Sequence, residues 1–310
     1  MNRQKSAAVQ ARSPARPARR YGTRERLALP VPLRPRPETR GSHARLPDYS
    51  VLIRTFNCEA LLPATLKALA AQTHPPSAYV FVDSGSTDRT VHAIPDGAQL
   101  HRFVGGAFNY SEAINQGLDF VPTAYVLILS AHMVIGHRGA VERMVRLLES
   151  TSTIGAAYMN GDNSSPLRHD FVERDNFTGF NGLSNACAVI RTDLLRERRF
   201  RPEVFSAEDQ EWARWLLFDR GQRVARFSGA GIVNNNPRKH FLRKRLNEYV
   251  AIAYFVDRKM LEWRHLARIA FRIVQPWRWP ALRERLFNLV LLARLLCCYV
   301  VAPRSASRYY

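Results

Sequence analysis

The sequence YSVLIRTFN at residues 49–57 is a short apolar run that ends in polar side chains. Its length and its β-branched content predict a strand that is buried on both faces of a sheet. Leucines at three- to four-residue spacing over residues 61–69 predict a helix, and AYVFV at residues 78–82 predicts a second buried strand. A strand, a helix and a strand of these lengths predict a βαβ unit with a right-handed crossover.

Polar residues follow both predicted strands. Thr55 and Asn57 end the first strand, and DSGSTD at residues 83–88 ends the second. Ligands of such sheets bind beyond the carboxyl ends of the strands, where the carboxylate of Asp83 can accept hydrogen bonds from a ribose or a base. Taken alone, DSGSTD is better explained as a loop with a helix cap, but two polar strand ends in one unit favour a nucleotide site. The glycine-rich fingerprints of dinucleotide-binding folds and of P-loops do not occur in the sequence.

The net charge of +20 is concentrated at the two ends of the chain. Residues 1–47 carry 12 Lys or Arg against two Glu, residues 258–310 carry 11 against two, and residues 48–257 carry 23 against 22 acidic residues. This pattern predicts a nearly neutral domain at 48–257 between a disordered Arg- and Pro-rich tail and a basic helical extension. Basic ends around a neutral domain disfavour a nucleic-acid groove and favour contact with an anionic surface.

The two ends also bear on the location of the protein. The first 47 residues lack the apolar segment of a secretory signal, and four cysteines without metal-binding spacing predict free thiols in a reducing compartment. From Leu286 to Ala302 the chain is apolar apart from Asn288 and Arg294. Because a spanning helix needs about 20 apolar residues, this segment predicts a helix that lies in a membrane interface. Packing against the domain and a dimer contact are the alternatives.

Three motifs of the chain resemble a known family. VLIRTFN at 51–57, LAAQ at 69–72 and VDSGSTD at 82–88 look like the opening signature of family 2 glycosyltransferases, which are inverting enzymes of the GT-A fold. The resemblance extends, with gaps, from about residue 49 to about residue 254.

The resemblance implies an α/β fold in which a mostly parallel central sheet is flanked by helices. Its nucleotide-binding half would span residues 48–135 and its acceptor half residues 136–257. The resemblance also implies that the nucleotide sugar is bound by side chains at the ends of the first two strands, namely Thr55, Asn57, Asp83 and Ser84.

A strand predicted at residues 125–129 ends in Ser130-Ala131-His132, where members of the family usually carry Asp-x-Asp. That pair normally holds a divalent cation that bridges the donor's phosphates. In one branch of the family, whose members build surface polysaccharides, this motif resembles the Ser-Ala-His form found here. The resemblance therefore implies that Ser130 and His132 lie near the diphosphate, with Mg²⁺ or Mn²⁺ as a possible cofactor and His132 as its candidate ligand. A strand-end histidine bonded to the backbone is the alternative for His132.

Two asparagines and one loop are further expectations. In the family, a residue like Asn115 lies beside the nucleotide, although a plain helix residue explains it equally well. By the same resemblance Asn185 faces the sugar on the acceptor side. The polar composition of residues 160–180 predicts a mobile loop over the site.

SAEDQEW at residues 206–212 contains the strongest catalytic candidates. Ser206 is a suitable N-cap, so Glu208 and Asp209 fall in the first turn of a helix, near the positive end of its dipole. Acidic residues are common there for electrostatic reasons alone. In family 2 enzymes, however, a Glu-Asp pair at this place carries the catalytic base. The resemblance implies that Asp209 deprotonates the acceptor hydroxyl and that Glu208 holds or polarises it.

A second departure from the family follows the last predicted strand. Members often have a histidine there, sometimes as a metal ligand, whereas this chain has asparagines at 234–236. His240 is the nearest substitute. The basic clusters at 238–240 and 243–245 could neutralise the diphosphate instead, and a solvated helix face explains them at least as well.

The leading hypothesis is an inverting glycosyltransferase that moves a sugar from a nucleoside diphosphate sugar to an acceptor hydroxyl. The acceptor would be a glycan or a lipid-linked acceptor in cell-surface polysaccharide or glycolipid synthesis. The expected location is cytoplasmic, peripheral at the inner face of the cell membrane. The main alternative is a non-catalytic, membrane-attached GT-A-like scaffold that has lost its metal site. A nucleotidyltransferase lacks its glycine-rich phosphate loop here, and nucleic-acid binding lacks interleaved aromatic residues.

Overall fold

The structure is a computed structural model that describes residues 46–164, 166–235, 241–274 and 282–304. The predictions for the N-terminal tail up to residue 45, for Asn236 and for the cluster at 238–240 lie outside the described residues. The limits predicted for the domains stay predictions.

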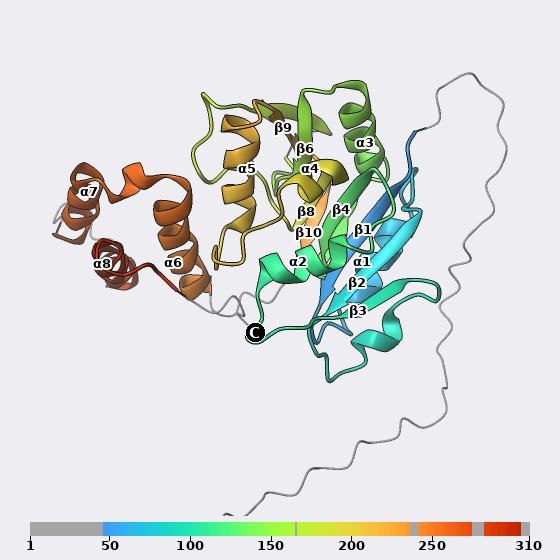
Figure 1. Cartoon of the computed structure of the whole chain (residues 1–310), viewed down its shortest axis with the longest axis horizontal. Helices are drawn as coiled ribbons and strands as arrows, with labels where there is room; N and C mark the ends of the chain where they lie inside the picture. Colours follow the sequence, from blue (N-terminus) through green and yellow to red (C-terminus); the bar gives the residue numbers. More distant parts are fainter. Residues whose placement is uncertain (1–45, 165, 236–240, 275–281, 305–310) are drawn as a thin grey trace, which may run out of the picture. The chain divides into compact units, whose positions relative to one another are not determined.

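An eight-stranded sheet with the strand order β3-β2-β1-β4-β8-β6-β9-β7 forms the centre of the described part (Figure 1). β3, β2, β1 and β4 are parallel, and so are β6 and β9, whereas β8 and the edge strand β7 run antiparallel to their neighbours. β5 and β10 form a separate two-stranded ribbon. The strands are β1 Tyr49–Thr55, β2 Ala78–Asp83, β3 Gln99–Arg102, β4 Tyr125–Ser130, β5 Met133–Ile135, β6 Ile154–Met159, β7 Arg168–Val172, β8 Cys187–Arg191, β9 Arg223–Ser228 and β10 Ile232–Asn234.

The predicted βαβ unit is confirmed. β1 pairs in parallel with β2, with Leu52 opposite Val80, and β4 pairs with β1 on its other side. Helix α1, Leu62–Ala70, connects β1 to β2 and has Pro63 in its first turn, where a missing amide costs no hydrogen bond. Every residue of β1 except Arg54 is buried, as expected for a strand covered on both faces.

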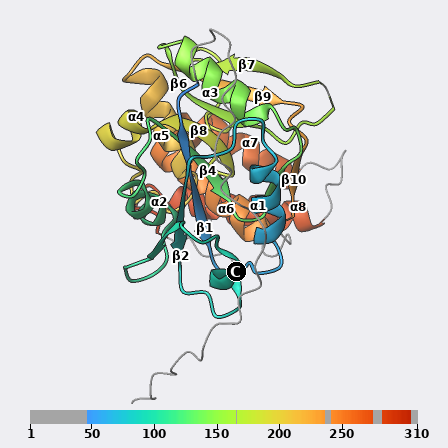
Figure 2. The same cartoon turned by 90° about the vertical axis from the view of Figure 1, so that its right-hand side faces the viewer.

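Helices cover both faces of the sheet, which confirms the predicted α/β architecture (Figures 1 and 2). Helices α1 and α3 pack against one face, and α2, α4 and α5 pack against the other. Val51 and Ile53 of β1 join the first core and Leu52 joins the second. Because side chains alternate along a strand, Arg54 lies on the α2–α5 side. The helices are α2 Tyr110–Leu118, α3 Ala140–Ser150, α4 Thr192–Glu197 and α5 Glu208–Phe218, with a 3-10 turn η1 at Thr90–Ala93.

The prediction of a mobile loop over residues 160–180 is wrong for its middle part, which forms the edge strand β7. β7 pairs with β9 along five residues. Arg226 on β9 donates to both carboxylate oxygens of Asp170 on β7, at 2.9 and 2.6 Å. Pairing with β9 and this cross-strand ion pair stabilise a segment whose own composition predicts a loop.

The C-terminal part is helical, as predicted, and forms a third hydrophobic cluster. Arg294 in the last turn of α8 donates to the amide oxygen of the buried Asn247 on α6, at 2.6 Å. This bond gives the charge inside the apolar segment a partner within the chain. None of the helices in the described residues has the length and hydropathy needed to cross a bilayer. The elements are α6 Phe241–Ala251, a π-helical turn η2 Ile252–Val256, a 3-10 turn η3 Arg258–Leu261, α7 Trp263–Val274 and α8 Leu282–Cys297.

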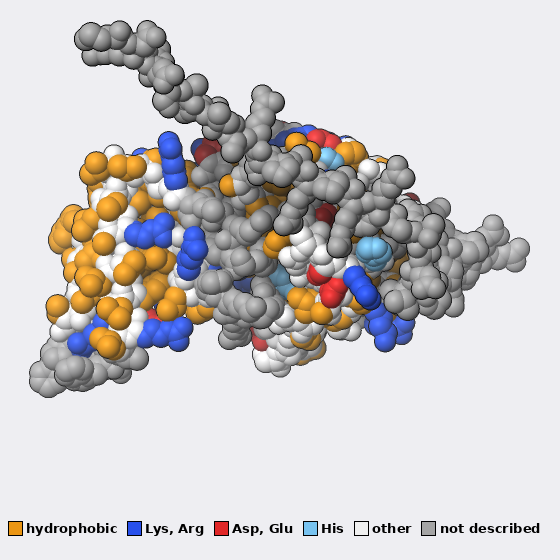
Figure 3. Space-filling view, turned by 90° about the horizontal axis from the view of Figure 1, so that it is seen from below, with side chains coloured by type: hydrophobic (Ala, Val, Ile, Leu, Met, Phe, Trp, Pro, Cys, Tyr) orange, Lys and Arg blue, Asp and Glu red, His pale blue; other side chains and the backbone are white. Residues whose placement is uncertain are grey.

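Large apolar side chains remain exposed on α7 and α8, next to arginines. Trp263 is 72% exposed and Leu282 is 74% exposed. Figure 3 shows hydrophobic side chains with Lys or Arg among them on the left, the side on which Figure 1 draws α7 and α8. We call this the α7–α8 surface, which comprises Trp263, Arg264, Arg268, Phe271, Arg272, Val274, Leu282, Leu286, Leu289, Val290 and Leu296.

Candidate active site

The loops at the carboxyl ends of β1 and β2 are cross-linked by hydrogen bonds. The hydroxyl of Thr55 donates to Oδ1 of Asp83 at 3.0 Å, and the hydroxyl of Ser84 donates to the carbonyl of Thr55 at 3.0 Å. Asn57 has a φ of 44°, in the left-handed region that asparagine adopts more readily than most residues. Its Oδ1 accepts from the backbone amide of Thr87 at 2.8 Å. The four predicted nucleotide-binding residues therefore lie together at one edge of the sheet.

Asp83 is buried, and its carboxylate accepts four hydrogen bonds from its own surroundings. Oδ1 accepts from the hydroxyls of Thr55 and Ser86 at 3.0 and 2.5 Å. Oδ2 accepts from the backbone amides of Gly85 and Ser86 at 3.1 and 2.9 Å. Since a carboxylate offers about four acceptor positions, Asp83 shapes this loop. A nucleoside would bond to its carboxylate only by replacing one of these donors.

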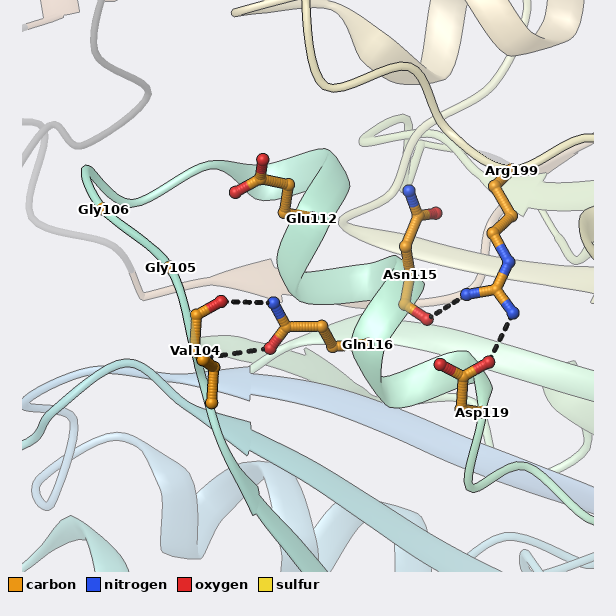
Figure 4. Close-up of a pocket in the computed structure, with 8 residues that line it drawn as sticks. All are labelled: Val104, Gly105, Gly106, Glu112, Asn115, Gln116, Asp119 and Arg199. Atoms are coloured by element: carbon orange, nitrogen blue, oxygen red, sulfur yellow. Dashed lines mark hydrogen bonds and ion pairs between the residues drawn. The ribbon is translucent and has the colours of Figure 1, made fainter.

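Asn115 on α2 holds the segment that leads to α5. Its amide nitrogen donates to the carbonyl of Phe200 at 2.8 Å, and its Oδ1 accepts from the amide of Phe200 at 3.1 Å. Its backbone carbonyl accepts from Arg199 at the rim of an open pocket of about 300 Å³ (Figure 4). Asn115 thus ties the nucleotide half to the acceptor half. The predicted contact between Asn115 and the nucleotide stays a prediction.

Ser130 ends β4 beside the end of β1, and His132 follows it in a turn. Ser130 is the register partner of Arg54, so the two residues lie side by side in the sheet. Burial, aided by the charges of Arg54 and Lys244, lowers the pKa of His132 to about 4. The imidazole is therefore neutral at pH 7, which is the form that binds metals.

These residues fit a divalent cation poorly. Of the two predicted positions, only His132 offers a good ligand, because a serine hydroxyl binds such ions weakly. The described part of the chain contains no group of three or more His, Cys, Asp or Glu side chains that could hold one ion. The guanidinium of Arg54 lies close enough to depress the pKa of His132, and a cation bound there would be repelled by it.

Glu208 and Asp209 open α5 as predicted, but the helix is capped differently. α5 begins at Glu208, and its N-cap is Ala207, whose φ of 58° lies in the left-handed region. The prediction of Ser206 as the N-cap is therefore wrong by one residue. Ala207 and Phe205 pack into the third hydrophobic cluster, and this packing can hold an alanine in a conformation that it seldom adopts.

Asn185 is bonded to both carboxylates. Its backbone amide donates to Oδ2 of Asp209 at 3.1 Å, and its side-chain amide donates to Oε1 of Glu208 at 3.3 Å. Glu208 is buried, whereas Asp209 keeps part of its surface exposed. The Oδ1 atom of Asn185 is buried without a hydrogen-bond partner. Its capacity to accept a hydrogen bond is therefore unused in this structure.

The pKa of Asp209 is raised to about 7. Burial is the largest cause and the charge of Glu208 the next, and Glu248 on α6 adds to them. Hydrogen bonds from the amides of Asn185 and Gln210 act in the opposite direction. A partly exposed carboxyl with a pKa near 7 is suited to accept a proton as a general base at neutral pH.

Two charged residues of this site, Arg54 and Glu248, were not among the predicted site residues. Nη1 of Arg54 lies 4.0 Å from Oε1 of Glu208, and its guanidinium lies over the ring of Tyr110 at 4.8 Å from the ring centre. A charged residue inside an apolar strand is the sequence signal that could have revealed Arg54. No such signal marks Glu248, which reaches the site from a helix rich in basic residues.

Two residues of the predicted basic cluster at 243–245, Lys244 and Arg245, make different contacts. Lys244 pairs with Glu248 at 3.6 Å, and its charge acts on His132. Arg245 instead pairs with Glu284 on α8 at 3.1 Å and lies over the ring of Phe287. Lys244 therefore has its charge near His132, while Arg245 joins α6 to α8.

Two family-level comparisons agree with this geometry. Residues 50–197 match the family model described as Glycosyl transferase family 2. Curated relatives from Mycobacterium bovis and Mycobacterium tuberculosis, named PGL/p-HBAD biosynthesis glycosyltransferase, are 33% identical over 93 residues. That match covers 27% of this chain and 35% of each relative, so the chain matches about a third of their length.

Solved structures share the fold at low identity. A mannosyltransferase from Pyrobaculum calidifontis, in complex with GDP-Man and Mn²⁺, is 19% identical with a TM-score of 0.56, over 85% of this chain and 78% of that one. TarS 1–349 from S. aureus is 16% identical with a TM-score of 0.52, over 81% and 80% of the two chains. Together with the mostly parallel sheet flanked by helices, these comparisons show that the chain has a GT-A-like fold, whose residues 50–197 match the glycosyl transferase family 2 model.

Proposed function

We propose that the protein is an inverting glycosyltransferase that moves a sugar from a nucleoside diphosphate sugar to an acceptor hydroxyl. The observation that carries this proposal is the partly exposed Asp209, whose pKa is raised to about 7 beside Glu208 and Asn185. The family match over residues 50–197 supports the reaction class.

Asp209 would accept the proton of the acceptor hydroxyl as the hydroxyl oxygen attacks the anomeric carbon. The bond between that carbon and the diphosphate oxygen would break on the opposite side, so the configuration at the anomeric carbon would invert. Glu208 would act through its charge, which helps to keep the pKa of Asp209 near neutrality. Oδ1 of Asn185 would accept a hydrogen bond from a hydroxyl of one of the sugars.

The donor would bind along the edge that contains the ends of β1, β2 and β4. Thr55, Asn57, Asp83 and Ser84 would form the nucleoside pocket, whose shape their mutual hydrogen bonds maintain. The ion pair between the end of β1 and α5 supports a donor at this edge, because Arg54 is adjacent to Thr55 and lies 4.0 Å from Glu208. The mannosyltransferase of similar fold was solved with GDP-Man, which favours a nucleotide-sugar donor.

A divalent cation remains part of the proposal only in a limited form. The same mannosyltransferase contains Mn²⁺. Here Mg²⁺ or Mn²⁺ would have to bind together with the donor's phosphates, and His132 would be its protein ligand.

The acceptor would be a glycan or a lipid-linked acceptor. Its proposed class is supported by the mycobacterial relatives, whose names place them in PGL/p-HBAD biosynthesis. The α7–α8 surface supports a peripheral position at the inner face of the cell membrane. On α7, Arg264, Arg268 and Arg272 recur every four residues and so lie along one side of the helix. Exposed apolar side chains next to such arginines suit an anionic lipid interface.

The enzymatic proposal is tested by a thermal-shift screen of UDP-, GDP-, CMP- and dTDP-sugars with and without Mn²⁺, followed by donor hydrolysis. A bound donor should raise the melting temperature by mass action and should be hydrolysed slowly in the absence of acceptor. Binding without any turnover would favour the non-catalytic scaffold. If none of the donors raises the melting temperature, the proposed function is wrong.

Membrane attachment is tested by sedimentation with vesicles of phosphatidylcholine alone or mixed with phosphatidylglycerol. The protein should sediment with the anionic vesicles, and replacement of Arg264, Arg268 and Arg272 by Gln should weaken binding by about fivefold per residue. Equal binding of the wild type and the triple variant would rule out this surface. A concentration-dependent dimer in size-exclusion chromatography that the surface substitutions disrupt would assign it to a second copy of the chain instead.

A further inference from the structure

We propose that Arg54 is the protein cation that binds the donor's diphosphate, beside Ser130, where a metal-binding carboxylate would be expected. This inference rests on the proposed function and gives a role to a residue of the VLIRTFN motif that is not among the predicted site residues. It starts from an unusual feature of β1, where Arg54 is the single residue that is not fully buried.

The register of the sheet places Arg54 at the donor edge. Arg54 pairs with Ser130 on β4 and with Val82 on β2. Paired residues of parallel strands point to the same face of a sheet, so the side chains of Arg54 and Ser130 share a face. The guanidinium therefore extends from the strand end at which ligands of open α/β sheets bind.

The guanidinium is buried but incompletely paired. The side chain of Arg54 is 12% exposed, and its Nη1 atom is buried without a hydrogen-bond partner. Burial of an arginine charge is unfavourable unless hydrogen bonds and an opposite charge compensate it. The ring of Tyr110, 4.8 Å from the guanidinium carbon, supports its position but accepts no conventional hydrogen bond. An anion with several oxygens would supply what is missing.

Glu208 is not a sufficient partner for Arg54. Its Oε1 lies 4.0 Å from Nη1, beyond hydrogen-bond distance. On the same helix, Oε1 of Glu211 accepts from Nη2 of Arg198 at 2.6 Å, and the Glu211 side chain is 6% exposed, although Nη1 of Arg198 is also buried without a partner. The pair of Arg198 and Glu211 shows that α5 can form an ion pair within hydrogen-bond distance. At Arg54 no such bond forms, so Nη1 lacks the oxygen partner that a phosphate would supply on binding.

The same Glu208 connects Arg54 to the acceptor side. Oε1 of Glu208 accepts from Asn185, whose Oδ1 is itself buried without a partner. Two atoms without hydrogen-bond partners therefore lie near the carboxylate of Glu208, namely the donor Nη1 of Arg54 and the acceptor Oδ1 of Asn185. This arrangement fits a ligand with phosphate oxygens at one end and a hydroxyl at the other, as a sugar diphosphate has.

The test is calorimetric binding of UDP and GDP in the presence of EDTA, each compared with its nucleoside. Replacement of Arg54 by Gln should weaken binding of the nucleoside diphosphate by about 10- to 100-fold, as expected for loss of a charge-assisted hydrogen bond. Nucleoside binding should be unchanged. Arg54→Lys should recover part of the loss, because a lysine keeps the charge without the planar fork.

Arg198→Gln is the matched control, because Arg198 pairs with Glu211 of α5, the helix that also contains Glu208. It should lower the melting temperature without changing the affinity for either diphosphate. The inference is wrong if Arg54→Gln binds both diphosphates like the wild type, if nucleoside affinity falls equally, or if the wild type binds only when Mn²⁺ is present. If the wild type binds neither diphosphate under any condition, the proposed function fails together with this inference.

Discussion

Asp83 and Asp209 lie at the carboxyl edge of the same sheet, but their surroundings differ in kind. Asp83 accepts four hydrogen bonds from two hydroxyls and two amides. Asp209 accepts one bond from the amide of Asn185 and one from its neighbour Gln210, and it lies near the carboxylates of Glu208 and Glu248. The comparison shows that the surrounding donors and charges, not the residue type, decide which aspartate holds a loop and which can take up a proton.

The dipole of α5 is too weak to cancel the rise in the pKa of Asp209. Asp209 is in the first turn of α5, where the dipole favours a negative charge by about 0.3–1 kcal/mol. That is less than one pKa unit, at about 1.4 kcal/mol per unit. Burial and the charge of Glu208 raise the pKa from 3.8 to about 7, so they outweigh the dipole.

The largest expected effect is on catalysis at Asp209. Asp209→Asn removes the proton acceptor while it keeps the size of the side chain. We expect a loss of transfer rate of about 10²- to 10⁴-fold, which is typical for loss of a general base. The measurement is sugar transfer at saturating donor, with donor binding as the control. Full activity of this variant would show that Asp209 is not the base.

The same substitution should stabilise the folded protein at high pH. The folded carboxyl keeps its proton up to about pH 7, whereas the unfolded one loses it near pH 4. The free energy of unfolding of the wild type therefore falls as the pH rises from about 4 to 7, and asparagine avoids this loss. Urea denaturation should find the Asp209→Asn variant more stable than the wild type by up to about 4 kcal/mol at pH 8 and equally stable near pH 3. If the variant is less stable than the wild type at pH 8, Asp209 holds its local structure as Asp83 does.

Asp83→Ala should have the opposite effect on stability. It leaves the amides of Gly85 and Ser86 and the buried hydroxyl of Thr55 without their acceptor, and we expect a loss of roughly 2–3 kcal/mol. Asp83→Asn is the matched variant, because its oxygen can still accept from the amides while its NH₂ group faces the hydroxyls. It should lose less stability in the same denaturation experiment. Equal losses for the two variants would argue against the four-bond description.

The smallest expected effect is a shift of the pH profile by Glu248→Gln. Glu248 raises the pKa of Asp209 less than burial and Glu208 do, so its removal should move the lower pH midpoint of transfer activity downwards by less than about one unit. Glu284→Gln is the control, because Glu284 pairs with Arg245 on α6. It should change stability alone. An upward shift in Glu248→Gln would contradict the proposed electrostatic coupling.

Local patterns were sufficient for the first half of the fold. The apolar run at 49–53 and the polar residues after it fixed the end of β1, because a strand buried on both faces tolerates few polar residues. The same reasoning placed Thr55, Asn57 and Asp83 at one edge, where they now lie. The first turn of α5 was also predictable from its acidic residues. The roles of Glu208 and Asp209 came from the family resemblance.

Other features depend on partners that are distant in the sequence. Ser206 looked like the N-cap, but packing of Phe205 and Ala207 against the C-terminal helices starts α5 one residue later. The polar segment around β7 looked like a loop until β9 paired with it. Long-range packing and pairing outweighed local preference in both cases.

By itself, the sequence determined the βαβ unit, the neutral middle with basic ends, and the residue types available at the sheet edge. The tertiary structure alone decided that Arg54 approaches Glu208, that Glu248 on α6 approaches Asp209, and that Arg294 meets Asn247. The physical reason is the difference between the distance along the chain and the distance in space over which these effects act. Strand and helix patterns arise from neighbours a few residues apart, whereas a pKa or a buried charge depends on every group within several ångströms in space.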